Sequence, residues 1–280
     1  MVKKRLMELL QNRFFALFFG TAVGLPFVFL LYLYAGPSIF TSGGGSIEKR
    51  DIIIFLPWNL SFILGMNYFA GWLKRAKGWK TNYTRKVTHI SNFSFLMMLT
   101  WFGGYTATLI FALLMIAHGI GIFIAGDGNI FYEAVAREQD EPYRAFYIVM
   151  PTVATIIAVL LNRAFFGPFA SVGYLVSGWG DASGEPVGVR FGKHKYRVPT
   201  ITGISCTRSY EGSAAVFFMS FFAATFSLVF LLDVSPILSI VAALVAAAGS
   251  TVVEAISPHG FDNFTLQLTS VALVWAVIHF

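Results

Sequence analysis

Two carboxylates and a group of basic side chains lie close together in Gly178–Pro199, "GWGDASGEPVGVRFGKHKYRVP", within a chain that is otherwise mostly apolar. Asp181 and Glu185 are four residues apart, so a helix would place them on one face, where they could hold Mg²⁺ together with phosphate oxygens. Glycines let backbone amides approach a phosphate, and lysines neutralise its charge. The residues that would do so are Gly184, Gly188, Gly192, Lys193 and Lys195. The structural alternative is an N-cap at Asp181 followed by ordinary loop glycines.

A second group of polar residues precedes an apolar segment in "TRKVTHI". Arg85 and Lys86 come four and three residues before His89, so all three can share one helical face. A guanidinium, an ammonium and an imidazole in this arrangement suit phosphate recognition. A basic belt at the level of the lipid head groups is the alternative.

The stretch "GDGNIFYEAVAREQDEPYR" places Asp127 between two glycines at the end of an apolar segment. A carboxylate in this setting leaves the backbone open to a ligand, which makes Asp127 a candidate metal ligand. Glu133 and Arg137 have the spacing of an i, i+4 ion pair on a short interfacial helix. The later residues of the stretch could equally form a solvated connector.

Two further motifs stand directly before apolar segments. In "TRSYEGSAA" the candidate phosphate-binding residues are Arg208, Ser209, Glu211 and Gly212, although Ser209 would also serve as an N-cap and Glu211 as a first-turn acid.

In "VVEAISPHGFDNF", Glu254 lies inside the end of an apolar segment, where an unpaired charge is costly and usually functional. Asp262 and Asn263 follow it, and they could cap the last helix or bind a nucleotide.

The composition indicates that membrane-spanning helices must position these residues. Of 280 residues, 56% are hydrophobic and 12% are charged, which is typical of an integral membrane protein. The net charge of +6 is better explained by membrane topology than by nucleic-acid binding. We expect a single polytopic membrane domain over 1–280, with N-terminal helices in 1–84 and a catalytic core in 85–263. The sequence indicates no oligomeric state.

We predict an all-α bundle of about nine transmembrane helices, since each crossing needs roughly 20 apolar residues. The expected spans are Phe14–Ala35, Ile52–Leu73, Val87–Trp101, Tyr105–Ala125, Phe146–Leu161, Ala164–Trp179, Ser213–Leu232, Pro236–Ile256 and Phe264–Phe280. The short pair around Asn162 and Arg163 could instead be a re-entrant hairpin.

The distribution of positive charge predicts the orientation. With the N-terminus in the cytoplasm, every Lys and Arg except Lys49, Arg50 and Arg163 falls in a cytoplasmic segment. Most carboxylates fall at the same ends of the helices, so we expect the catalytic loops on the cytoplasmic face. A membrane transporter, the alternative from another class, should carry its acids near the middle of the bilayer.

Taken in order, "RKVTH", "GDASGEPVGVRFG", "RSYEGSAA" and "GFDN" resemble the polyprenol kinase family, which includes dolichol kinase, phytol kinase and the CTP-dependent diacylglycerol kinase of fungi. The residues that match its recurring positions are Arg85, Lys86, His89, Asp181, Gly188, Asp262 and Asn263. Many phytol kinase-like members have Lys-Ser where this chain has Arg208 and Ser209. The resemblance implies transfer of the γ-phosphoryl group, usually of CTP and with ATP left open, to the hydroxyl of a membrane-embedded isoprenoid alcohol or diacylglycerol.

On this interpretation Asp181, together with Asp127, would hold Mg²⁺. Arg85, Lys86, Lys195 and Arg208 would clamp the triphosphate, and Glu185 or His89 would accept the proton of the alcohol.

The general plan of the chain also resembles the related CTP:phosphatidate cytidylyltransferases. Because "SPHGFDNF" lacks the second Asp and the Arg of their signature, this is the second candidate.

Overall fold

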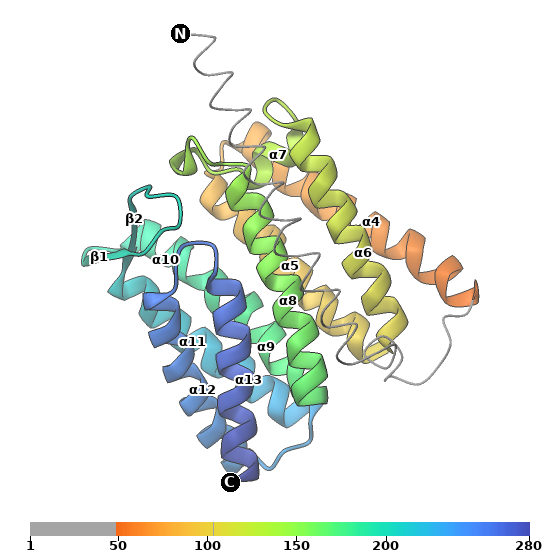
Figure 1. Cartoon of the computed structure of the whole chain (residues 1–280), viewed down its shortest axis with the longest axis vertical. Helices are drawn as coiled ribbons and strands as arrows, with labels where there is room; N and C mark the ends of the chain where they lie inside the picture. The colour runs from red at the N-terminus through yellow and green to blue at the C-terminus, as the bar shows by residue number, and fades with distance from the viewer. Residues whose placement is uncertain (1–48, 103) are drawn as a thin grey trace. The chain divides into compact units, whose positions relative to one another are not determined.

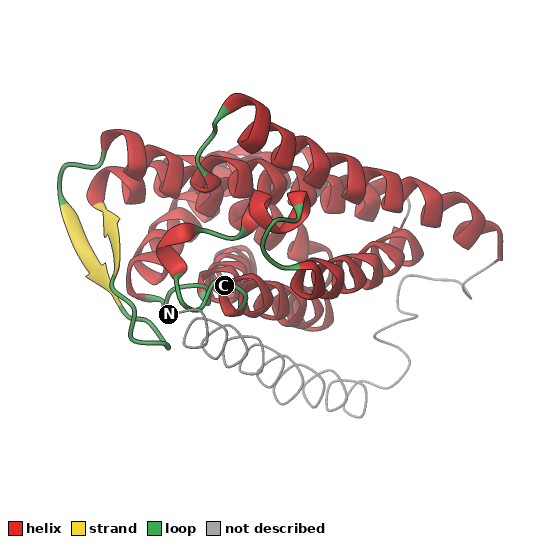
Figure 2. Cartoon of the chain, turned by 90° about the horizontal axis from the view of Figure 1, so that it is seen from above, coloured by secondary structure: helices red, strands yellow, loops and turns green. Residues whose placement is uncertain are grey.

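The computed structural model describes residues 49–102 and 104–280. These residues are helical except for loops and one antiparallel two-stranded hairpin (Figures 1 and 2). The predicted span Phe14–Ala35 lies outside the described residues. The sequence predicted no strand, because the hairpin strands are only four residues long and lie in a polar connection.

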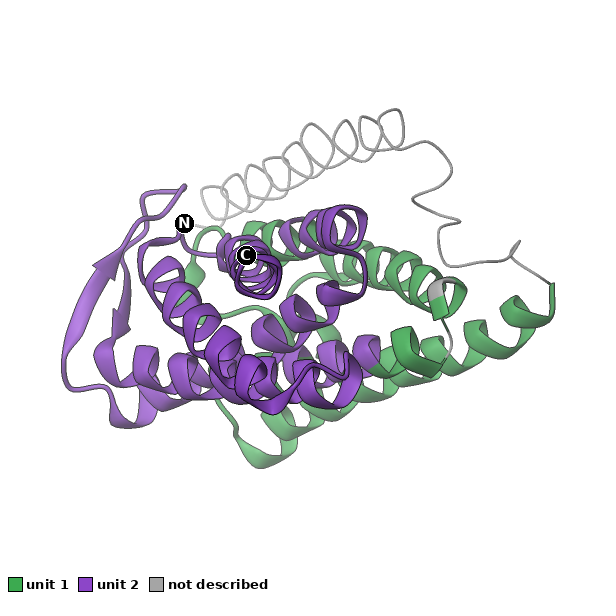
Figure 3. Ribbon diagram, turned by 90° about the horizontal axis from the view of Figure 1, so that it is seen from below, with its two compact units in different colours: residues 1–88, 98–153 green, residues 89–97, 154–280 purple. Residues whose placement is uncertain are grey.

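The described chain falls into two compact units (Figure 3). The first contains Met98–Val153 and the chain before His89, and the second contains His89–Met97 and Ala154–Phe280. Helix α5 (Thr81–Phe102) contributes to both units. Most of the predicted catalytic motifs therefore belong to the second unit, whereas Arg85, Lys86 and Asp127 belong to the first.

The first unit is organised around α4 (Lys49–Lys77), which packs against α6 (Gly104–Ala125) and the short α7 (Ile130–Val135). Asn59 of α4 donates a hydrogen bond to the Ala107 carbonyl, 3.0 Å away. This buried hydrogen bond links α4 to α6, and such contacts between apolar helices are common in membrane bundles.

The connector after α6 differs from its expected form. Helix α7 ends at Val135, so the predicted ion pair between Glu133 and Arg137 is wrong. Glu133 pairs with Arg75 of α4 at 2.8 Å, and Arg137 pairs with Asp140 at 2.9 Å. The hydrogen bond from Arg75 is the main cause of the lowered pKa of Glu133.

The second unit consists of helices that follow one another along the chain. Helix α8 (Phe146–Phe166), whose later part belongs here, is followed by η3 (Gly167–Phe169), α9 (Ala170–Leu175), the π-helical η4 (Val176–Asp181) and α10 (Ala182–Phe191). The hairpin of β1 (Lys195–Val198) and β2 (Cys206–Ser209) comes next. It leads to α11 (Tyr210–Phe226), π-helical η5 (Ser227–Leu231), α12 (Pro236–Ile256) and α13 (Asp262–His279).

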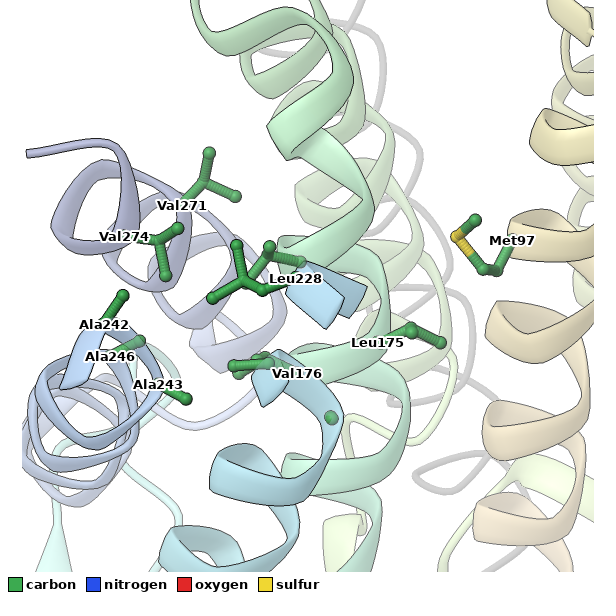
Figure 4. Packing of buried hydrophobic residues seen from close by; sticks show 12 residues of the cluster. Met97, Leu175, Val176, Leu228, Ala242, Ala243, Ala246, Val271 and Val274 are labelled. Carbon is green, nitrogen blue, oxygen red and sulfur yellow. The ribbon is translucent and has the colours of Figure 1, made fainter. Parts of the chain in front are cut away.

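The core of this unit is built from aliphatic side chains, many of them small (Figure 4). Alanines 242, 243 and 246 of α12 are fully buried, as are Val271 and Val274 of α13 and Leu228 of η5. Small side chains allow α12 to lie close to α11 and α13, with which it packs extensively.

Five apolar segments among the described residues are long enough to cross a membrane, which indicates an integral membrane protein. They are Lys49–Lys77, Thr106–Ala125, Phe146–Phe191, Tyr210–Leu231 and Pro236–Ile256. Helices α5 and α13 form where spans were predicted, but both are too polar to be counted with these five. The total of nine spans and their orientation stay predictions.

The break between the fifth and sixth predicted spans lies later than expected. Helix α8 continues through Asn162 and Arg163 to Phe166, so the predicted turn at these two residues is wrong. The helix direction changes at Gly167, whose φ of 56° favours glycine, and Pro168 follows it.

Glycine brings η4 against α5 within the second unit. A Cβ on Gly178 would overlap the Cβ of Phe93, an atom too close to its own backbone to move aside. We therefore expect Gly178→Ala to lower the thermal midpoint of unfolding in detergent by about 3 to 10 °C.

The matched control is Gly119→Ala in helix α6, where nothing lies within 4 Å of the added methyl group. Alanine favours helix over glycine, so this variant should be at least as stable as the parent. Equal midpoints for Gly178→Ala and the parent chain would contradict the close packing.

Candidate active site

Asp181 and His89 form the first contact of the candidate site. His89 Nε2 lies 3.0 Å from the Ser177 carbonyl oxygen and 3.6 Å from Asp181 Oδ2. A carbonyl only accepts hydrogen bonds, so Nε2 must carry a proton and act as the donor. Both side chains are largely buried. His89 of "RKVTH" and Asp181 of "GDASG" thus meet within the second unit.

The π-helical segment η4 sets the position of this pair. Gly178 lies against Phe93, and Trp179 Nε1 donates a hydrogen bond of 2.9 Å to Ser94 Oγ. Both partners lie on α5, one turn beyond His89. A π-helical turn inside a helix is frequently found at functional sites because it redirects side chains.

Asp181 does not act as a helix cap. Its backbone is helical and continues from η4 into α10, and its side chain makes no capping hydrogen bond. The N-cap alternative is therefore wrong. Glu185 follows one turn later on the same continuous helix, as its spacing predicted.

Arg208 forms a second charged contact with two carboxylates. Its Nε lies 2.8 Å from Glu254 Oε1, and its Nη2 lies 2.7 Å from Asp262 Oδ2. The three side chains are 14%, 6% and 13% exposed. The carboxylates come from the end of α12 and the start of α13, so Arg208 joins the hairpin to both helices.

The charges around Arg208 include Asp181. Burial would lower the pKa of Arg208, but the negative charges of Asp262, Glu254 and Asp181 outweigh burial and raise it. Arg208 therefore stays charged at every physiological pH, and Asp181 lies near enough to interact with it. These residues, with His89, bring four separate sequence motifs to one region of the second unit.

Asp262 and Asn263 are fixed at the start of α13. Asp262 Oδ1 accepts a hydrogen bond from the Asn263 amide at 3.0 Å, while its other oxygen contacts Arg208. The Asn263 amide group donates to Thr155 Oγ1 of α8 at 3.1 Å. Asp262 thus combines a local backbone contact with a buried ion pair.

The hairpin and its junction with α11 carry Arg208 into the site. Ser209 caps α11, since its Oγ accepts a hydrogen bond from the Gly212 amide at 3.1 Å, which confirms the structural alternative for this residue. Glu211 contacts His194 Nδ1 at 2.8 Å on the exposed side of the junction. Tyr196 lies beside Arg208 across the strand pair, and its hydroxyl contacts Ser213 Oγ at 2.7 Å.

The candidate phosphate-binding glycines lie in a tight contact between helices. A Cβ on Gly184 would meet Val216 of α11, and a Cβ on Gly212 would meet the Gly184 carbonyl. Those on Gly188 and Gly192 would meet the Ser209 side chain. Packing of α10 against the start of α11 is sufficient to explain these glycines, and contact with phosphate stays a prediction.

Three of the predicted site residues belong to the first unit. Asp127 is half exposed and pairs with Arg144 at 2.7 Å within the first unit. Arg85 and Lys86 also belong to that unit, although α5 is unbroken and carries them on the same helix as His89. Their contacts with a metal or a triphosphate stay predictions.

The cluster contains three carboxylates, Asp181, Glu254 and Asp262, against the guanidinium of Arg208. This excess of negative charge fits a cation better than a bare polyphosphate. Among the described residues no group of three or more His, Cys, Asp or Glu side chains could hold a metal by itself. Mg²⁺ commonly takes only one or two protein carboxylates and completes its shell with phosphate and water, so Asp181 fits such a site.

Sequence reasoning missed residues that support the site. Thr155, which holds Asn263, is an ordinary threonine inside an apolar helix and gives no local signal. Tyr196 could have been found from the alternation in "KYRV" if the hairpin had been recognised.

Comparison with known proteins identifies a distant relative. Phytol kinase from Synechocystis sp. is 28% identical over 198 residues, which covers 69% of this chain and 78% of the relative. No family model matches the chain, and no solved structure matches it. This distant homology supports the family that the four motifs indicated.

We expect Arg208→Met to be strongly destabilising, because it leaves Glu254 and Asp262 without their cation. Removing one partner of a buried ion pair typically costs about 3 to 5 kcal/mol. Chemical unfolding in detergent measures this change.

The exposed Arg50→Met is the control and should change stability by no more than about 0.5 kcal/mol. Adding Glu254→Gln to Arg208→Met should recover part of the loss, as coupled residues do in a double-mutant cycle. Equal stability of Arg208→Met and Arg50→Met would contradict the ion cluster.

Proposed function

We propose that this chain, a distant homologue of phytol kinase, phosphorylates a lipid alcohol in the membrane. The acceptor is the hydroxyl of an isoprenoid alcohol, and the donor is the γ-phosphoryl group of a nucleoside triphosphate, with CTP preferred. The observation that carries the proposal is that two buried contacts, His89 with Asp181 and Arg208 with Asp262, lie in the second unit, with Asp181 near enough to Arg208 for their charges to interact.

Phosphoryl transfer requires positioning and charge compensation more than covalent help from the protein. Asp181 would hold Mg²⁺, which when bound supplies positive charge to the phosphate oxygens. Arg208 has its Nε and Nη2 engaged by carboxylates, and its buried Nη1 has no hydrogen-bond acceptor among the described residues. That nitrogen is the donor we assign to a phosphate oxygen.

The reaction forms a bond between the alcohol oxygen and the γ-phosphorus and breaks the bond to the bridging β-phosphate oxygen. The products are a lipid phosphate and a nucleoside diphosphate. The proton of the alcohol must pass to a base. His89 Nε2 donates to the Ser177 carbonyl, so this nitrogen already holds a proton. A neutral His89 therefore accepts a proton only at Nδ1. We assign the base to Glu185, one turn from Asp181, and treat His89 as a residue that positions Asp181.

The membrane provides the acceptor. Long apolar helices make up most of the second unit, and Glu254 lies near the end of one of them, α12, while Asp262 begins α13. A lipid whose hydrocarbon stays in the bilayer would present its hydroxyl at head-group depth, while the nucleotide stays in water. We place this surface on the cytoplasmic side, following the distribution of Lys and Arg in the sequence.

The activity is tested with purified protein in detergent, Mg²⁺, and CTP or ATP labelled at either the α- or γ-phosphate. The acceptors are phytol, a shorter prenol, diacylglycerol and phosphatidate. A kinase yields lipid phosphate labelled only from the γ-position. Label from the α-position in a lipid product would instead indicate cytidylyl transfer, and no labelled lipid with any acceptor would contradict both.

We expect Asp181→Asn to lower kcat by about 100-fold or more, because it removes the charge that would hold the metal. The folded yield should stay near that of the parent chain, since asparagine has nearly the same shape. The matched control is Asp233→Asn, at an exposed position with a φ of 52°, where asparagine is equally well tolerated. Full activity of Asp181→Asn would remove our metal assignment.

A further inference from the structure

The hairpin of β1 and β2 has two chemically different faces. In an antiparallel pair, opposite residues point to the same side. Tyr196 is opposite Arg208, and these two side chains face the charged cluster. Arg197 is opposite Thr207, and these residues, with Lys195, form the outer face. All three outer residues are exposed.

The outer face is strongly basic. Lys195 and Arg197 are joined by exposed Lys193 just before β1 and by Arg190 near the end of α10. None of these four side chains makes an ion pair with any residue in the described part of the chain. Basic side chains that gather without acidic partners indicate an anionic ligand.

Large apolar side chains are exposed beside these charges. Phe191 is 57% exposed at the end of α10, with the Arg190 guanidinium 5.3 Å from its ring centroid. Ile201, in the loop that joins the strands, is 46% exposed. A soluble phosphate would not require such neighbours, whereas a lipid surface would bind both the basic and the apolar groups.

The position of the hairpin agrees with a lipid surface. Figures 2 and 3 show the strands projecting from the helices of the second unit. The hairpin follows directly on the apolar segment that ends at Phe191 and precedes the one that begins at Tyr210. The hairpin thus connects the ends of two apolar segments, and aromatic and basic residues are enriched where such segments approach the lipid head groups.

We propose that the outer face of the hairpin, defined by Lys193, Lys195, Arg197 and Thr207 with Phe191 beside it, docks on the head groups of anionic lipids. This assigns Lys193 and Lys195 to the membrane surface in place of the triphosphate. Because Arg208 lies on the other face of the same strands, docking of the outer face would also steady the charged cluster. The inference does not depend on the identity of the phosphorylated alcohol.

Cys206 is the single cysteine of the chain, so replacing it allows one reporter thiol to be placed at a chosen position. In a Cys206→Ser background, Thr207→Cys places a reporter thiol on the outer face. The protein is reconstituted into lipid nanodiscs of phosphatidylcholine alone, or with about 30 mol% phosphatidylglycerol. The rate of reaction with a membrane-impermeant maleimide is then measured, and we expect it to fall about threefold or more in the anionic discs. High salt should abolish the difference.

Lys195→Gln with Arg197→Gln should remove the dependence on phosphatidylglycerol. The matched control, Lys49→Gln with Arg50→Gln, removes the same charge from exposed positions at the start of α4 and should leave the dependence intact. A thermal midpoint measured for each variant shows that it is folded.

Equal labelling rates in the two kinds of disc would overturn the proposal. Protection of the thiol by CTP in phosphatidylcholine discs would also overturn it, because this result would show that the basic face binds the nucleotide. Both outcomes are independent of whether a lipid alcohol is phosphorylated.

Discussion

A buried positive charge shared by two carboxylates is the constraint on which the arrangement of the second unit depends. Arg208, Glu254 and Asp262 come from a strand and from two different helices, and each is largely removed from water. Ions are stable in such surroundings only when their partners are held at contact distance. The hairpin, the end of α12 and the start of α13 are therefore fixed together. The charge of Asp181 extends the same network to the π-helical segment.

Close packing of small residues allows this charged cluster to form at the end of an apolar bundle. Gly178 brings η4 against α5, which places Asp181 beside His89. Gly184 and Gly212 bring α10 against α11, and Ser209 completes the first turn of α11. In the apolar interior, alanines serve the same purpose for α12. The closely packed apolar helices thus hold the polar side chains at their ends in fixed positions. Phosphoryl transfer requires such precise positioning.

The sequence contained enough information to predict the helices and the motifs, but not all of their contacts. Apolar length predicted most segments because hydrocarbon requires about 20 residues for a crossing. The turn at Gly167 was missed because the polar residues Asn162 and Arg163 suggested an earlier break between two spans. Both residues lie inside a continuous helix. The hairpin was missed because four-residue strands give little periodicity.

The candidate site was predicted in part. His89, Asp181, Arg208 and Asp262 lie on separate motifs, and their order along the chain predicted one site; all four residues belong to the second unit. Glu254 was recognisable because a carboxylate in an apolar helix needs a partner. The face of the hairpin on which Lys195 lies is set by the register between the two strands. The local sequence does not reveal how the strands pair.

The central claim is that the carboxylates gathered near Arg208 create a site for a metal-bound nucleotide. It is tested most directly by titrating the protein with Mn²⁺, a paramagnetic substitute for Mg²⁺, in the presence and absence of CTP. Electron paramagnetic resonance measures the concentration of free Mn²⁺. The account predicts that CTP increases Mn²⁺ binding to the parent protein beyond binding to CTP alone, and that Asp181→Asn abolishes this increase. An equal increase in Asp181→Asn would contradict it.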